Sequence, residues 1–246
     1  MKKYTVLPKR NKDLKINAKY VILYYINWND VRQNERMMHM KRFAVTIART
    51  CGSGGTPIAK LLCEEYGISL YDKKLLALAA QRSGINEALF HQADESNSKS
   101  LLYKISKKVY AGEIISPHSD DYTREDNLFN CQAQTLKELA DSESLVCVGR
   151  AGDYVLKDCP NLLRIFLYAP FEVCVKNEMK RLGITEKEAQ KHITQTNKNR
   201  REYYHFHTGR DWENPEHYDI CFDTSTFRAY AECAQIIKTC IDQRFQ

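Results

Sequence analysis

From about residue 40 to the end of the chain, short apolar runs alternate with stretches whose apolar residues recur at helical spacing. Five of the runs have the length and composition of buried strands. They cover residues 43–48, 68–71, 145–148, 162–167 and 218–222. The predicted helices cover residues 56–66, 73–83, 171–182, 185–205 and 227–241, and residues 86–140 are mostly helical in pattern. Strands that alternate with helices predict an α/β fold, in which a parallel sheet is flanked by helices.

Proline, glycine and aspartate mark where several of these elements begin and end. Pro57 suits the first turn of a helix, and Gly67 is predicted to end that helix. Asp72 is predicted to cap the following helix, which Gly84 stops. The helical pattern of residues 86–140 is broken by a predicted loop at residues 112–121.

Positive charge is concentrated at the N-terminus. The 246-residue chain has a formal charge of +6, but residues 1–42 carry eleven Lys and Arg against three Asp and Glu, which leaves −2 for the rest. We interpret residues 1–39 as a basic extension outside a domain that spans residues 40–246; alternatively, residues 20–28 pack on that domain as a strand. A basic excess is typical of nucleic-acid binding, but here it concerns this segment alone.

The remaining composition is that of an ordinary soluble protein, with 43% hydrophobic and 28% charged residues. Its nine cysteines contain no Cys-x-x-Cys pair. We interpret them as small buried hydrophobes of a reduced, cytoplasmic protein. No apolar stretch approaches the roughly 20 residues that span a membrane. The pair His205 and His207 has no Cys or His partner at metal-ligand spacing, and is interpreted as a polar face.

The strongest candidate for chemistry is a glycine-rich turn between the first predicted strand and the helix after it. It resembles the phosphate-binding pattern G-x-x-x-x-G-K-[ST], in which backbone N–H groups approach phosphate oxygens. Gly54 and Thr56 match the last glycine and the hydroxyl that would hold Mg²⁺. Arg49 replaces the first glycine, however, and Gly55 replaces the lysine. The missing cation must come from elsewhere, with Arg49, Lys60 and more distant arginines as candidates; a tight turn without a ligand is the alternative.

Two further groups of residues fit the same chemistry. Arg150 follows the end of a buried strand, where ligands gather in open parallel sheets. Its guanidinium suits a phosphate group, although it could equally be a structural arginine in a turn. Asn197, Arg200 and Arg201 lie on the long polar helix, which could close over phosphates as a lid or simply present a solvated face.

In order and spacing, these motifs resemble those of nucleoside monophosphate kinases, and most closely the cytidylate-kinase-like proteins. The motifs that carry the resemblance are Arg49-Thr50-Cys51-Gly52-Ser53-Gly54-Gly55, Leu70-Tyr71-Asp72-Lys73, Val148-Gly149-Arg150, Arg164-Ile165-Phe166-Leu167 and Asn197-x-x-Arg200. The resemblance implies a P-loop kinase fold with a helical acceptor-binding insertion at about residues 86–140 and a lid at about residues 185–210. It also implies ATP with Mg²⁺ as the donor, and CMP or dCMP as the acceptor.

The resemblance also implies roles for individual residues. The residues expected to hold the ATP phosphates are Gly52, Ser53, Gly54, Gly55 and Thr56, with Thr56 also at the metal. The residues expected to stabilise charge during transfer are Arg49, Arg150 and Arg200. The residues expected at the acceptor are Asp72, Arg150 and Asp153.

The chain departs from cytidylate kinases at three positions. Gly55 replaces the loop lysine, Ala151 replaces the acid that follows Gly-Arg, and Asn197 replaces the acid of the lid. Two other hypotheses therefore stay open beside phosphoryl transfer to a nucleotide or another small molecule. One is a nucleotide-binding regulator without catalysis, which Gly55 and Asn197 favour. The other is a nucleic-acid-binding protein that acts through its basic arm.

Overall fold

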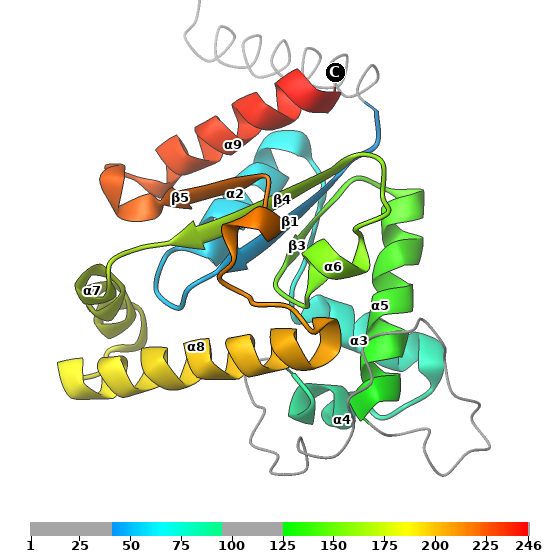
Figure 1. Cartoon of the computed structure of the whole chain (residues 1–246), viewed down its shortest axis with the longest axis horizontal. Helices are drawn as coiled ribbons and strands as arrows, with labels where there is room; N and C mark the ends of the chain where they lie inside the picture. Colours follow the sequence, from blue (N-terminus) through cyan, green and yellow to red (C-terminus); the bar gives the residue numbers. More distant parts are fainter. Residues whose placement is uncertain (1–40, 95–124, 246) are drawn as a thin grey trace, which may run out of the picture. The chain divides into compact units, whose positions relative to one another are not determined.

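A computed structural model describes residues 41–94 and 125–245 (Figure 1). Contacts group the chain into two units, residues 1–40 and residues 41–246, and all the described residues belong to the second. The alternatives for residues 1–39, the predicted loop at residues 112–121 and much of the predicted insertion lie outside the described residues.

The centre of the second unit is a sheet of five parallel strands in the order β2-β3-β1-β4-β5. The strands are β1 (Ala44–Arg49), β2 (Ser69–Tyr71), β3 (Leu145–Val148), β4 (Leu162–Tyr168) and β5 (Ile220–Asp223). Each lies within two residues of a strand predicted from its apolar run. The order places β1 in the middle, between β3 and β4, which explains why its first five residues are all buried.

The helices connect the strands. They are α2 (Gly55–Tyr66), α3 (Lys74–Ser83), α4 (Glu87–Gln92), α5 (Glu125–Ser142), α6 (Gly152–Val155), α7 (Phe171–Leu182), α8 (Glu186–Thr208) and α9 (Tyr230–Phe245). Short 3₁₀ turns, η2 (Pro215–His217) and η3 (Thr224–Thr226), flank β5. The structure confirms the predicted α/β fold; only the single-turn α6 and the 3₁₀ turns were not predicted, because they are too short to show a period.

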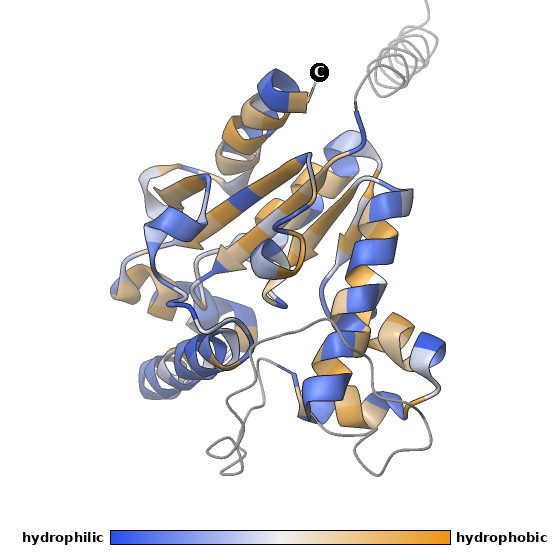
Figure 2. Cartoon of the chain, turned by 45° about the vertical axis from the view of Figure 1, so that its right-hand side comes forward, coloured by the Kyte–Doolittle hydropathy of each residue, from blue (hydrophilic) through white to orange (hydrophobic). Residues whose placement is uncertain are grey.

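Alternation along the strands divides the core between two layers of helices. Ala44, Leu145 and Phe166 belong to one buried cluster with residues of α5, α6 and α8. The intervening residues, such as Val45 and Ile47, are equally buried and point to the opposite face. Figure 1 shows α2 and α6 on opposite sides of the sheet, and Figure 2 shows the strands apolar while α8 is largely hydrophilic.

Four of the described helices, α2, α3, α7 and α8, end at a glycine in the left-handed conformation. Thr185 and Glu188 form a reciprocal capping box at the start of α8. Asp72 was expected to cap α3, but Lys73 occupies the N-cap position. The carboxylate of Asp72 instead accepts the N–H of Lys74 at 3.4 Å, in the turn before the helix.

Two other expectations need correction. His207 was assigned to a polar face, yet it is buried and stacks on Phe129 with ring centroids 3.9 Å apart. Six of the nine cysteines are buried as predicted, whereas Cys221 is exposed. Among the helices within residues 41–94 and 125–245, none is long and apolar enough to cross a membrane.

Candidate functional site

The candidate residues meet at one edge of the sheet because all five strands are parallel. Ile47 of β1 lies beside Val148 of β3, and Tyr71 of β2 lies beside Cys147. The glycine loop after β1, Asp72 after β2 and Arg150 after β3 therefore leave the sheet at neighbouring positions. This is the edge at which ligands bind in open α/β sheets.

The loop between β1 and α2 is a tight turn in which two positions accept only glycine. Gly52 and Gly54 have φ angles of +86° and +85°. A side chain at Gly52 would lie 2.7 Å from the carbonyl oxygen of Cys174, and one at Gly54 would meet the ring of Tyr230 at 2.2 Å. Turns of this kind make a concave nest of N–H groups, and the first N–H groups of α2 have no partner within the helix. The geometry therefore fits an anion.

Ser53, between these glycines, holds the turn together rather than facing a ligand with its side chain. It is fully buried, and its hydroxyl donates to the carbonyl oxygens of Thr50 at 2.9 Å and Leu167 at 3.2 Å. The hydroxyl of Thr224 donates to the carbonyl oxygen of Ser53 at 2.8 Å. The N–H of Ser53 also donates within the turn, to the carbonyl oxygen of Thr50 at 3.3 Å, so a phosphate contact of Ser53 would have to share or replace these bonds.

Gly55 is needed for space and not for its φ angle. It is the first residue of α2 and is buried. A β-carbon there would lie 2.8 Å from both Cβ and Cγ of Arg49. The stem of Arg49 therefore runs through the position from which a lysine side chain at residue 55 would begin. Arginine at residue 49 and glycine at residue 55 are sterically coupled, which the sequence alone did not show.

Helix α8 is hydrogen-bonded directly to the loop. The side-chain oxygen of Asn197 accepts the N–H of Cys51 at 2.8 Å, and Arg200 donates from Nη1 to the carbonyl oxygen of Arg49 at 3.0 Å. Two of the three predicted lid residues thus lie at the glycine loop, whereas Arg201 is exposed and pairs with Glu213. Sequence reasoning missed Asn177 of α7, which donates to the carbonyl oxygen of Gly52 at 2.8 Å; an asparagine within an amphipathic helix gives no signal of this contact.

Arg150 is buried and paired with a carboxylate. Its side chain is 3% exposed, and it forms a salt bridge with Asp94, which is 2% exposed. Arg150 and Ala151 both have positive φ, at 64° and 49°. Such angles are unfavourable for residues other than glycine and occur at sites where the surroundings impose them. Asp94 was not predicted, because it lies at the end of a short helix far from any recognisable motif.

The two aspartates predicted at the acceptor lie in different surroundings. Asp72 is half-buried at the end of β2, close to the edge that carries the loop. Asp153 is 6% exposed and accepts a hydrogen bond from the hydroxyl of Tyr204 at 2.6 Å. Burial raises the pKa of Asp153. The structure therefore places its carboxyl group in the core beneath α8 rather than at an open surface.

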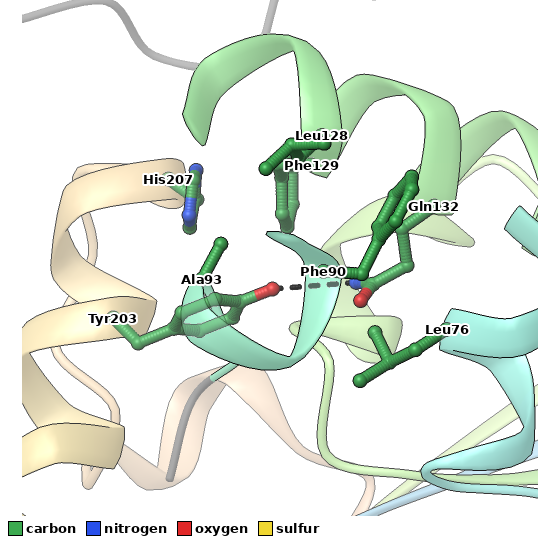
Figure 3. A pocket seen from close by; sticks show the side chains of 8 residues that line it. All are labelled: Leu76, Phe90, Ala93, Leu128, Phe129, Gln132, Tyr203 and His207. Carbon is green, nitrogen blue, oxygen red and sulfur yellow. Dashed lines mark hydrogen bonds between the residues drawn. The ribbon is translucent and has the colours of Figure 1, made fainter. Parts of the chain in front are cut away.

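A small cavity lies among the helices next to Asp94 in the chain. It is lined by residues of α3, α4, α5 and α8, namely Leu76, Phe90, Ala93, Leu128, Phe129, Gln132, Tyr203 and His207 (Figure 3). Its enclosed space is about 10 Å³, which is room for roughly one water molecule. The amide of Gln132 donates to the hydroxyl of Tyr203 at 3.3 Å. Ala93, which lines the cavity, directly precedes Asp94, the partner of Arg150.

Comparisons with known proteins agree with this geometry. Residues 44–226 match the model of a family described as the cytidylate kinase-like family. A protein named cytidylate kinase from Methanopyrus kandleri is 28% identical over 199 residues, which cover 80% of this chain and 92% of that one. A protein of the same name from Pyrococcus horikoshii is 25% identical over 83% of this chain and 91% of its own length.

A solved structure shows the same fold. It is that of an uncharacterized protein from Eubacterium ventriosum, with 28% sequence identity and a TM-score of 0.60. The match covers 83% of this chain and the whole of the other. The architecture described above is therefore shared along almost the entire length of that protein.

Proposed function

The chain belongs to the cytidylate kinase-like family, and we propose that it transfers the γ-phosphoryl group of ATP to a nucleoside monophosphate, CMP or dCMP. A bond forms between a phosphate oxygen of the acceptor and the γ-phosphorus. The bond from that phosphorus to the β–γ bridging oxygen breaks, and ADP leaves. Catalysis of this kind consists mostly of positioning and charge neutralisation.

One observation carries the proposal: α8 is hydrogen-bonded to the glycine loop at the same sheet edge from which Arg150 departs. Arg200 donates to the carbonyl oxygen of Arg49 at 3.0 Å, and Gly149 donates its N–H to the carbonyl oxygen of Ile47 at 3.0 Å. Donor phosphates at the loop and an acceptor phosphate at Arg150 would thus be bound by adjacent strands. This is the proximity that phosphoryl transfer needs.

On the donor side, the backbone of Gly52 to Gly55 would hold the ATP phosphates, and the hydroxyl of Thr56 would hold Mg²⁺. When bound, Mg²⁺ neutralises phosphate charge and fixes the donor. The missing lysine is replaced, we infer, by Arg49, whose stem passes over Gly55. Arg200 would neutralise the charge that develops in the transition state, as lid arginines do.

On the acceptor side, Arg150 would bind the phosphate in place of the carboxylate of Asp94. A base could reach the ring faces of Phe90 and Phe129 only if the neighbouring cavity widened, because its enclosed space of about 10 Å³ holds roughly one water molecule. Asp72 remains the candidate to orient the acceptor. Asp153 would act only from beneath, through Tyr204, because its carboxyl group is buried.

The test is ADP formation by the purified full chain with Mg-ATP and each of CMP, dCMP, UMP, AMP and GMP. Removal of Arg150 alone would take the guanidinium away from the buried carboxylate of Asp94, which is destabilising in itself, so the informative variant is R150M/D94N. We expect activity with one or two pyrimidine acceptors, and a loss of roughly 10²–10³-fold in the variant. Arg82→Ala is the control, because Arg82 is an exposed arginine paired with Glu138 on the surface.

A regulator that binds nucleotides without catalysis is the second candidate. It is favoured by Asn197, whose neutral amide already accepts a loop N–H, and by the absence of lysine at position 55. Calorimetric binding of ATP without ADP formation with any acceptor would establish this alternative and overturn the kinase. Full activity of R150M/D94N would instead remove the proposed acceptor site.

A further inference from the structure

Three side chains with metal-ligand atoms meet beside the glycine loop. They are Cys51 of the loop, Glu178 of α7 and His192 of α8, and their ligand atoms all lie within 4.8 Å of one another. Nε2 of His192 lies 3.5 Å from a carboxylate oxygen of Glu178. Thiolate, imidazole and carboxylate are the three ligand types that Zn²⁺ uses in proteins. Within the described part of the chain, no other group of three such residues converges in this way.

The spacing suits a tetrahedral ion after a small adjustment. Zinc–ligand bonds of about 2.0–2.3 Å imply roughly 3.3–3.6 Å between neighbouring ligand atoms. The pair formed by His192 and Glu178 already meets this spacing. The thiol of Cys51 must approach the others by up to about 1.5 Å, which rotation of the three side chains can supply.

Burial gives the site a closed floor and an open entrance. Cys51 is 6% exposed and Glu178 is 4% exposed. The side chain of His192 is 40% exposed. A cation could therefore enter past the imidazole, and water could fill the fourth position on the same side, as in sites with three protein ligands.

Glu178 already has a cationic partner that can be exchanged. Arg181 donates from Nε to both carboxylate oxygens at 3.1 and 3.2 Å, but its own side chain is 58% exposed. The guanidinium can thus turn into solvent while a bound ion compensates the buried carboxylate. Arg200, also close to Cys51, opposes a cation but favours the thiolate. Binding converts the thiol into a metal-bound thiolate and releases one proton to solvent.

We propose that Cys51, Glu178 and His192 form a Zn²⁺ site that fastens α7 and α8 to the glycine loop. The ion would connect the glycine loop to α8, whose Asn197 and Arg200 are already hydrogen-bonded to the backbone of Cys51 and Arg49. It would thereby hold α8 against the loop. If the proposed function is right, zinc bound here slows phosphoryl transfer, because nucleotide entry and release need these elements to separate.

Binding is tested on the full chain, kept reduced, by calorimetric titration with Zn²⁺ and by the absorption of bound Co²⁺, which reports thiolate ligation. The variants are Cys51→Ser and His192→Gln. The matched controls are Cys221→Ser, an exposed thiol, and His205→Gln, an exposed imidazole of the same helix. We expect both variants to lose one equivalent of zinc or to bind it at least about tenfold more weakly, and both controls to match the wild type.

Equal stoichiometry and affinity in the wild type, His192→Gln and Cys51→Ser would overturn the site. The regulatory part rests on the proposed function and is measured separately, as ADP formation with and without zinc in the wild type and His192→Gln. Inhibition confined to the wild type supports it, and equal inhibition of both overturns it. If the wild type forms no ADP, the kinase proposal fails while the binding titration still decides the site.

Discussion

At the scale of single residues, positions 49 and 55 show how a phosphate loop can lack its lysine. Each differs from the usual pattern, with arginine where glycine is expected and glycine where lysine is expected. A β-carbon at residue 55 would lie 2.8 Å from Cβ of Arg49. The two departures are therefore one coupled exchange, in which the cation enters the loop from β1 instead of from α2.

This coupling predicts strong non-additivity. Arg49→Gly should lower phosphoryl transfer by roughly 10²–10³-fold, because a charge-stabilising donor is lost. Gly55→Lys alone should also be inactive, because its stem collides with that of Arg49. The double variant R49G/G55K restores G-x-x-x-x-G-K-T and should recover much of the activity lost in either single variant. Steady-state ADP formation measures this cycle.

Lys60→Ala is the control for this cycle. Lys60 was the other nearby candidate for the missing cation, but it is exposed on α2, and if Arg49 supplies the charge it should be dispensable. Losses that simply add in R49G/G55K would contradict the exchange. ATP binding, followed by calorimetry in the same four proteins, separates failure of the loop from failure of catalysis.

The sequence predicted some of these residues for physical reasons and missed others. Glycines in a turn between a strand and a helix can be recognised from the local sequence, because such a turn needs backbone conformations and close contacts that only glycine allows. Asp94 and Asn177 could not be found in this way. Their partners, Arg150 and the carbonyl oxygen of Gly52, are brought to them only by the packing of α4 and α7.

At the scale of elements, α8 was predicted almost to its ends, since its capping box and polar pattern are local. What the pattern did not reveal is which side of the helix meets the loop. Asn199, Tyr203 and His207 are buried on the core side, while Asn197 and Arg200 are half-buried at the loop. Although the polar sequence of α8 is typical of a solvated helix, the helix therefore packs on the core with one side and on the glycine loop with another.

The contact between α8 and the loop can be tested without nucleotide. Asn197→Ala removes the acceptor of the Cys51 N–H. Because one hydrogen bond contributes about 1 kcal/mol, we expect roughly fivefold faster hydrogen exchange at the loop. Mass spectrometry of a peptide that covers residues 50–54 measures it. Lys198→Ala, at an exposed position next along α8, should leave the loop unchanged, and equal exchange in both variants would contradict the contact.

At the scale of the whole molecule, the P-loop kinase fold was predicted and is confirmed. The local spacing of apolar residues specifies the α/β class, because it shows that strands and helices alternate along the chain. The order β2-β3-β1-β4-β5 does not follow from local pattern. It is set instead by pairing between strands that lie about a hundred residues apart in the sequence, such as β1 with β3 and β4.

Global stability should depend on pH through His207. Burial lowers the pKa of this imidazole to about 3, against about 6.5 in an unfolded chain. Between these values the unfolded state binds a proton that the folded state does not, so the free energy of unfolding falls as pH falls. Between pH 7.5 and 5 this contributes a loss of about 2 kcal/mol, which His207→Gln should abolish in urea unfolding.

His205→Gln is the control for this dependence, since His205 lies exposed two residues earlier in the same helix. It should keep the acid destabilisation of the wild type. An unaltered pH dependence in His207→Gln would show that other groups cause the acid sensitivity.

The central position of β1 has a consequence for how the protein is made. Both strands that pair with β1 follow it by about a hundred residues or more. At about 5–20 residues per second, a ribosome would need roughly 5–20 s after β1 to supply them. During that interval β1, whose first five residues are buried in the folded sheet, is nascent chain with two open edges, which favour aggregation. Folding in the cell should therefore begin late, and β1 is the segment that a chaperone at the ribosome would have to shield.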